Sequence, residues 1–305
     1  MRHVTEEKMM TDEFKTYHPI INFLYFAFMI VCSCIFMHPV CLFISLAGAF
    51  TYSIMQNGKK SVKTNILYML PTVLVMALLN PLFNHQGVTI LAYFPDGNPL
   101  TFESIIYGID AAVMVISVIA WFGCCNRIMT SDKMIYLFGR IVPSLSLVLS
   151  MTMRFIPKFA KDTKKVCDAQ RGIGFDINKG KITTRMKTAT KVVSVMLTRS
   201  LENSIETADS MKSRGYGTKK RTAFSVFRFD SRDVCMLVMM LIFGSVTVSG
   251  VVLGGVRWQY YPQLNFTAGT PYAAITFIAY GMMAFMPVMI DIWEGIRWNV
   301  IKSKI

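Results

Sequence analysis

Seven runs of apolar residues recur along this chain of 305 residues, and most are close to the length that crosses a bilayer. A membrane-spanning helix needs roughly 20 consecutive apolar residues. Charged residues make up only 16% of the sequence, against about 25% in soluble domains. The sequence therefore predicts an all-α, polytopic membrane protein. The runs are residues 20–37, 39–55, 66–82, 104–125, 134–155, 234–254 and 271–290.

Positive charge is concentrated in residues 157–231, which carry 17 Lys and Arg against 7 Asp and Glu, a net charge of 17 − 7 = +10. Loops rich in Lys and Arg are retained in the cytoplasm. Nucleic acid is disfavoured as a partner, because this segment lacks the interleaved aromatic residues on which bases stack. The segment is therefore expected to be cytosolic.

The same rule predicts the sidedness of the whole chain. Lys59, Lys60 and Lys63 indicate a cytosolic loop, whereas residues 80–103 contain no Lys or Arg and are expected outside. Arg257 is the one exception, since it falls in a loop assigned to the outside. The predicted topology has about six transmembrane helices in the cell membrane, with both termini cytosolic.

One apolar run, residues 134–155, is expected not to cross the lipid bilayer. It contains Arg140 and Arg154, and charges at bilayer depth are costly. Pro143 interrupts it. A span here would also place the basic segment outside. We therefore expect a helix pair at the cytosolic interface.

Three domains follow from this topology. Residues 1–133 form an N-terminal membrane domain with four spans. Residues 134–231 form interfacial and cytosolic helices that are long and amphipathic. Residues 232–305 form a C-terminal membrane hairpin.

A single unbroken helix is predicted from Thr183 to Arg214, about 48 Å long at 1.5 Å per residue. Apolar residues recur along it at helical spacing. Such a stripe can bind a partner or simply pack on neighbouring helices. The methionines in it suit a surface that repacks against several partners. The candidates for binding a membrane partner are Met186, Val193, Met196, Leu197, Leu201 and Ile205.

Two helix ends in the basic segment share an arginine followed by glycine. A glycine after the last helical residue can adopt the left-handed conformation that ends a helix, and arginine there complements the helix dipole. The alternative is a docking function, because arginine recognises carboxylates with fixed geometry and an adjacent aromatic adds apolar contact. The candidate docking residues are Gln170, Arg171, Gly172 and Phe175 at one end and Ser213, Arg214, Gly215 and Tyr216 at the other.

These motifs resemble those of the transmembrane coupling (T) subunit of energy-coupling factor (ECF) transporters, whose two cytosolic helices each end in an Ala-Arg-Gly-type motif. Gln170 and Ser213 stand where the family has alanine, and His18-Pro19 stands where an Asp-Pro pair is expected. The resemblance covers most of the chain and is most specific from about residue 80 to residue 227. It is carried by Asn80-Pro81-Leu82-Phe83, Met153-Arg154-Phe155-Ile156-Pro157 and Ala208-Asp209-Ser210-Met211-Lys212-Ser213-Arg214-Gly215-Tyr216-Gly217.

The resemblance implies a non-catalytic subunit of an ATP-driven importer. Its partners would be two cytosolic ATP-binding cassette (ABC) ATPases, which bind the ATP, and a small membrane subunit that captures a vitamin or metal ion. The arginine ends would dock into the ATPases. No cofactor is implied for this chain itself.

Other functional classes lack their sequence signatures. An intramembrane enzyme would need a nucleophile–base pair or paired carboxylates, and no catalytic residues are expected. The cysteines and histidines show no metal-ligand spacing. A secondary transporter would show an inverted repeat, which is not visible. A conventional ABC permease or a secondary transporter with its own substrate pathway remains the alternative.

Overall fold

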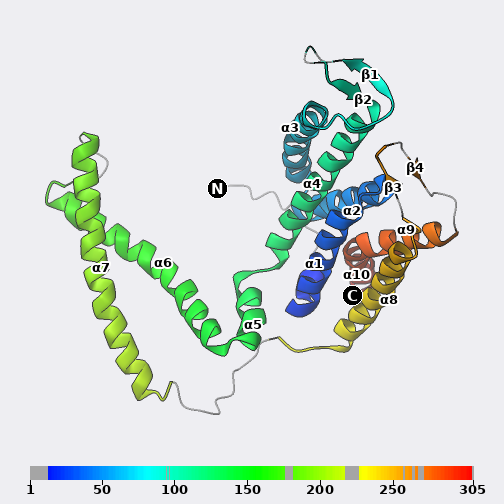
Figure 1. The fold of residues 1–305 in the computed structure, drawn as a ribbon. Coiled ribbons are helices and arrows are strands. Elements are labelled where there is room, and N and C mark those ends of the chain that lie inside the picture. Colours follow the sequence, from blue (N-terminus) through cyan, green and yellow to red (C-terminus); the bar gives the residue numbers. More distant parts are fainter. Residues whose placement is uncertain are drawn as a thin grey trace. The chain divides into compact units, whose positions relative to one another are not determined.

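The computed structural model describes residues 13–93, 95, 97–175, 181–216, 227–256, 258–262, 265, 266 and 271–303 (Figure 1). Arg257 and Gly217 lie outside this part of the chain. The described elements are mainly helices, which confirms the all-α class. They form two compact units, Met1–Thr130 with Phe227–Ile305 and Ser131–Val226. We call them the bundle unit and the arm unit.

The bundle unit contains a 3₁₀ helix, seven α-helices and two short strand pairs among the described residues. Their order follows the chain in Figure 1. The elements are η1 (Glu13–Thr16), α1 (Pro19–Ile35), α2 (Pro39–Asn57), α3 (Lys59–Phe83), β1 (Ile90–Tyr93), β2 (Pro99–Thr101), α4 (Phe102–Ile128), α8 (Ser231–Val252), β3 (Trp258–Gln259), β4 (Asn265–Phe266), α9 (Pro271–Ala284) and α10 (Met286–Lys302).

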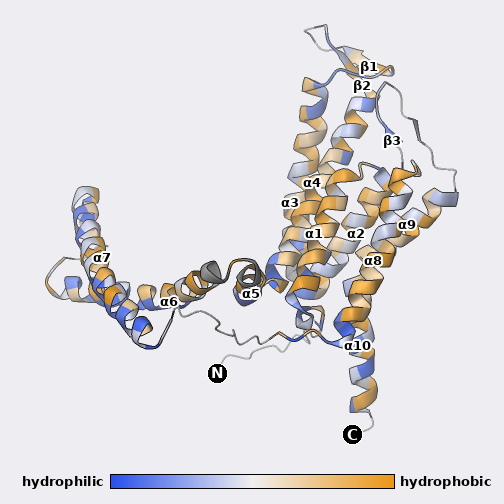
Figure 2. Ribbon diagram, turned by 60° about the horizontal axis from the view of Figure 1, so that its bottom comes forward, coloured by the Kyte–Doolittle hydropathy of each residue, from blue (hydrophilic) through white to orange (hydrophobic). Residues whose placement is uncertain are grey.

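Four described helices are long and apolar enough to cross a membrane: α2, α3, α4 and α8. α9 and α10 pass the same test as a pair that is bent by 53°. α1 is apolar but has only 17 residues. These helices, which are largely hydrophobic in Figure 2, support the assignment of the chain as a polytopic membrane protein. The expected total of six spans stays a prediction.

Two predicted loops contain regular structure. Lys59, Lys60 and Lys63 belong to the first turns of α3, and the break after α2 is Gly58 alone, with φ = 60°. Beyond α3, the antiparallel pair β1–β2 occupies part of the predicted loop 80–103. The buried Glu103 carboxylate accepts hydrogen bonds from the Thr89 N–H and Oγ1, which fixes this hairpin to the start of α4.

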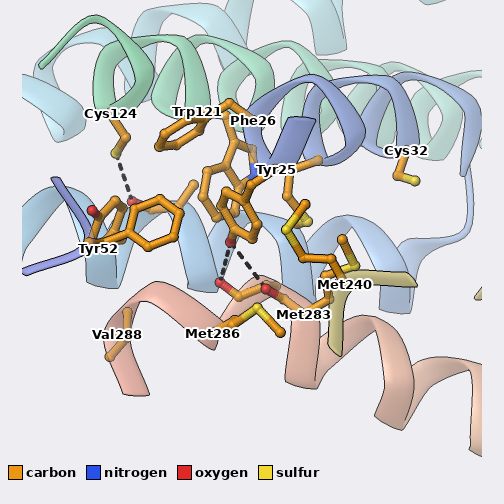
Figure 3. Close-up of a cluster of buried hydrophobic side chains, with 14 of the residues drawn as sticks. Tyr25, Phe26, Cys32, Tyr52, Trp121, Cys124, Met240, Met283, Met286 and Val288 are labelled. Atoms are coloured by element: carbon orange, nitrogen blue, oxygen red, sulfur yellow. Dashed lines mark hydrogen bonds between the residues drawn. The ribbon is translucent and has the colours of Figure 1, made fainter. Parts of the chain in front are cut away.

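The core of the bundle unit contains both aromatic and aliphatic side chains, and one of its tyrosines supplies hydrogen bonds at the α9–α10 break (Figure 3). Pro287 has no N–H, so the carbonyl of Met283 lacks its usual partner four residues on. The buried Tyr25 hydroxyl donates instead to the Met283 and Ala284 carbonyls, at 3.1 and 3.3 Å. A helix break inside an apolar core is thereby hydrogen-bonded.

The segment before α1 is held by two buried aspartates that are distant in sequence. The Phe14 N–H donates to Asp291 Oδ1 of α10 at 3.1 Å, and the His18 N–H donates to Asp233 Oδ1 of α8 at 3.1 Å. The Phe14 ring is fully buried, with the Tyr25 ring 5.3 Å away. Residues 13–18, which we call the N-terminal clip, therefore link α8 and α10.

The arm unit consists of α5 (Ser131–Ile141), α6 (Pro143–Gly172) and α7 (Ile182–Ser213). The break between α5 and α6 lies at Val142, directly before Pro143, the residue that was predicted to interrupt the helix. α6 then continues through Pro157, so no new helix begins there. α7 confirms the unbroken helix predicted from the sequence.

α6 and α7 contact each other through few buried side chains. Val166 of α6 packs with Val192 and Met196 of α7, and Cys167 lies beside them. Thr188 is also buried. In Figure 2 both hydrophobic and hydrophilic residues lie along α7, as expected of an amphipathic helix.

Candidate functional site

The C-terminal end of α6 is closed by the second of its two glycines. Gly172 is the last helical residue, Ile173 is the C-cap, and Gly174 adopts the left-handed conformation with φ = +93°. The Gly174 N–H donates to the Arg171 carbonyl at 3.0 Å, and the Phe175 N–H donates to the Gln170 carbonyl at 2.9 Å. This pair of bonds is a Schellman motif.

The end of α7 has the same motif, but here the first glycine closes it. Ser213 is the last helical residue, Arg214 is the C-cap, and Gly215 has φ = +73°. The Gly215 N–H donates to the Lys212 carbonyl at 2.9 Å, and the Tyr216 N–H donates to the Met211 carbonyl at 3.0 Å. Sequence and structure therefore agree on the role of Gly215.

The two Arg-Gly motifs are not structurally equivalent, which corrects the interpretation of a simple repeat. The left-handed glycines Gly174 and Gly215 lie 215 − 174 = 41 positions apart, whereas Arg171 and Arg214 lie 43 apart. Matching the caps therefore pairs Arg171 with Lys212. Gly172, expected to end its helix in the left-handed conformation, is helical instead.

Cap matching also reveals a shared pattern that the sequence interpretation missed. Each end reads Asp, two residues, a basic residue, two residues, Gly and an aromatic. The signal was present in the sequence, but aligning the arginines hid it. The matched residues are Asp168 with Asp209, Arg171 with Lys212, Gly174 with Gly215, and Phe175 with Tyr216.

Most side chains of the candidate docking residues are accessible. Arg171 is exposed and lies 4.0 Å from Asp168, measured from Nη1 to Oδ1. Arg214 and Ser213 are exposed, and the Ser213 hydroxyl donates to the Ser210 carbonyl at 2.8 Å. Phe175 is partly covered, because Lys191 Nζ of α7 lies 4.4 Å from its ring centroid.

The apolar stripe predicted on α7 divides between two faces of the helix. Met196 is only 7% exposed and packs against Val166, so it belongs to the face of α7 that contacts α6. Its position is a correction to the predicted partner surface. The other five members are 55–67% exposed, and we call them the α7 stripe. They are Met186, Val193, Leu197, Leu201 and Ile205.

A groove of about 640 Å³ runs between α6 and α7 within the arm unit. Phe155 and Phe159 line it from α6, and Ala208 and Met211 line it from α7. No member of the α7 stripe lines this groove. The arm unit therefore carries two separate apolar surfaces, the groove and the α7 stripe.

The described residues contain no cluster of three or more His, Cys, Asp or Glu side chains that could hold a metal ion. The seven cysteines are all free thiols. Of these, Cys167 alone lies in the arm unit, where it contacts the buried residues between α6 and α7.

Comparison with known proteins identifies the family. Residues 14–224 match the family model CbiQ, described as cobalt transport protein. The energy-coupling factor transporter transmembrane protein EcfT of Lactobacillus helveticus is 32% identical over 111 residues, which are 36% of this chain and 40% of that protein. EcfT of Listeria innocua is 31% identical over 102 residues, 33% of this chain and 38% of that protein.

A third relative, EcfT of Bacillus selenitireducens, is 27% identical over 128 residues, which are 41% of this chain and 48% of that protein. The chain thus covers less than half the length of each of these curated relatives. The family model, by contrast, extends over more than half of the chain. The chain therefore belongs to the CbiQ cobalt transport protein family, which includes the transmembrane (T) components of energy-coupling factor transporters.

Proposed function

We propose that this chain couples two cytosolic ABC ATPase subunits to a small membrane subunit that captures a vitamin or metal ion. The chain itself binds no cofactor, and ATP is bound by the ATPases. It resides in the cell membrane with both termini and the arm unit on the cytosolic side. The relatives' names as energy-coupling factor transporter components support this assignment.

The observation that carries the proposal is the pair of capped helix ends in the arm unit. Each Schellman motif fixes the last turn of a helix, so the charged side chain there is presented from a rigid backbone. Arg171 and Arg214 are both exposed at these ends. Guanidinium groups held in this way suit carboxylates on an ATPase surface, because their donors have fixed geometry.

The α7 stripe is the surface that we assign to the capture subunit. Its five side chains are exposed although they are apolar, and they recur at intervals of seven and four residues along one face of α7. Exposed apolar patches of this kind mark interaction sites in proteins. The separation of the α7 stripe from the groove leaves it free to bind while α6 and α7 stay in contact.

Co-purification with alanine variants tests the proposal. The tagged chain is extracted in mild detergent, and the two ATPases and the small membrane subunit are quantified by mass spectrometry. Arg214→Ala and Arg171→Ala each remove a charge-assisted contact worth about 1.5–3 kcal/mol, which corresponds to a roughly 10- to 100-fold loss of affinity. Lysine at either position restores binding only partly.

Lys187→Ala is the matched control, because Lys187 is exposed on α7 but far from its C-terminal end. It should retain the ATPases as the parent chain does. Retention of both ATPases at parental levels in the double variant Arg171→Ala/Arg214→Ala would refute the docking role. A secondary transporter or an enzyme would bring down no ATPase from the start.

A further inference from the structure

The strand β1 exposes apolar side chains along its whole length. Side chains alternate between the two faces of a sheet, so a strand with one face in water normally alternates apolar and polar residues. β1 reads Ile90-Leu91-Ala92-Tyr93, and all four residues are exposed. Leu91 is 55% exposed and Tyr93 is 68% exposed. Neither face of β1 is polar, and neither is covered by the described part of the chain.

The exposed apolar surface continues from β1 onto the C-terminal end of α3. The β1–β2 hairpin lies directly beyond the ends of α3 and α4 in Figure 1 and in Figure 2. Only 6% of the span Asn65–Phe83 in α3 is buried, as expected of a helix that faces lipid. We call the continuous set the hairpin surface. Its members are Leu82, Phe83, Val88, Ile90, Leu91 and Tyr93.

Hydrogen bonds fix the hairpin to the ends of both helices. The Ser104 hydroxyl donates to the Asn84 carbonyl at 2.7 Å, and Asn80 Nδ2 donates to the Ser104 carbonyl at 2.7 Å. The Thr101 hydroxyl donates to the Gln86 carbonyl at 2.9 Å. Polar groups at the base of the hairpin are thus paired internally, while the apolar side chains of β1 are exposed. The hairpin surface therefore has a fixed position relative to the end of α3.

The chemistry of the hairpin suits one of the three environments at the end of a membrane span. In bulk water a patch of large apolar side chains is unfavourable. In the hydrocarbon core an open strand edge is too costly, and a two-stranded sheet has two such edges. The membrane–water interface is hydrated enough for the edges and accommodates apolar and aromatic side chains, tyrosine above all.

We propose that the hairpin surface binds the interfacial layer of the outer lipid leaflet and anchors the adjoining ends of α3 and α4 there. Lipid surrounds a strand on both faces, whereas a protein partner would pack against one. Residues 80–103 contain no Lys or Arg, so the contact is apolar and does not depend on ion pairs with lipid phosphates. The anchor goes beyond the proposed function and requires none of its partner subunits.

Depth-dependent fluorescence quenching tests the anchor. The fluorescent amino acid Anap replaces Leu91, and the full chain is reconstituted in lipid nanodiscs, both alone and with its co-purifying partners. Lipids that carry a nitroxide near the headgroup should quench position 91 about twofold more than lipids labelled near the chain end. Aqueous iodide should quench it about fivefold less than it quenches Anap at Lys187, an exposed position of α7.

A label within the span provides the reference for depth. Anap at Leu74, which is 59% exposed in α3, should be quenched most by the nitroxide near the chain end. Strong iodide quenching at position 91 without quenching by lipid nitroxides would overturn the anchor. Lipid quenching that is seen for the chain alone but lost in the complex would assign the surface to a protein partner and overturn it as well. Nanodiscs present both leaflets alike, so neither result bears on the proposed function.

A polar variant of β1 provides the second test. Ile90→Thr/Leu91→Thr removes apolar contact and keeps residues that favour strands. In nanodiscs the hairpin amides should exchange about fivefold faster or more, because part of the transfer free energy that holds the hairpin in the interface is lost. Gln86→Asn, at an exposed polar position of the same connection, is the control and should leave exchange unchanged. Unchanged or slower exchange in the double variant would show that the hairpin lies in water.

Discussion

At the residue scale, the conformation of a few glycines decides where each arm helix ends. Gly172 and Gly174 are two residues apart, yet the first is helical and the second is left-handed. A Cβ at either position would meet no atom within 4 Å, so space does not distinguish them. Only the backbone conformation does.

Alanine substitutions at these two glycines should have opposite effects. Gly172→Ala should stabilise the last turn of α6 by about 0.5–1 kcal/mol, because alanine favours the helix. Gly174→Ala should destabilise it by about 1 kcal/mol, because alanine is strained at positive φ. Hydrogen–deuterium exchange of the last turn of α6 measures both: protection should rise about two- to fivefold in Gly172→Ala and fall about fivefold in Gly174→Ala. Effects of the same sign would contradict the assigned helix end.

The two arginine-containing helix ends were predicted from the sequence only in part. The sequence predicted the role of Gly215 in ending α7 correctly, whereas the docking role of the four candidate residues at each end stays a prediction. The sequence interpretation aligned the two ends two residues out of register, because Arg-Gly-x-Gly is the more conspicuous repeat. The choice of which glycine is left-handed depends on hydrogen bonds to the preceding turn, which the residue types alone do not specify.

At the element scale, α7 places different apolar residues on different surfaces. Met196 is buried against α6, whereas Leu197, its neighbour in sequence, belongs to the exposed α7 stripe. Periodicity predicted the amphipathic helix and its length well. It could not predict which of the apolar residues α6 covers, because that depends on the crossing of two helices.

Truncating these two neighbouring residues should have unequal effects on the stability of the arm unit. Met196→Ala leaves a cavity between α6 and α7 and should destabilise the arm unit by about 2 kcal/mol. Leu197→Ala should change its stability by less than about 0.5 kcal/mol. Hydrogen–deuterium exchange along α7 in the purified chain measures both. Equal loss of protection in the two variants would contradict the burial described here.

At the scale of the whole molecule, residues distant in sequence hold the bundle unit together. The N-terminal clip is hydrogen-bonded to α8 through Asp233 and to α10 through Asp291. Asp233 Oδ2 also accepts a hydrogen bond from the Asp230 N–H at 3.0 Å, directly before α8. The sequence patterns predicted the apolar helices. They could not predict the hydrogen bonds of the N-terminal clip, because these bonds depend on tertiary contacts between distant residues.

Removing either carboxylate should weaken the bundle unit. Asp291→Ala leaves the buried Phe14 N–H without its acceptor, and Asp233→Ala does the same to the His18 N–H. A buried donor left unpaired costs about 1–3 kcal/mol. The midpoint of thermal unfolding in detergent should fall for both. Thr16→Ala, whose hydroxyl bonds only within η1, is the control. An unchanged midpoint for both aspartate variants would contradict the structural role of the N-terminal clip.

The central claim, that the arm unit reaches cytosolic ATPases, requires its helix ends to lie in the cytosol. Ser213→Cys adds a thiol at the exposed end of α7, and the parent chain with its native cysteines is the control. A membrane-impermeant maleimide should label the added thiol in inverted membrane vesicles but not in intact cells. Labelling of this thiol in intact cells would place the arm unit outside, where no ATP-driven subunit could bind it.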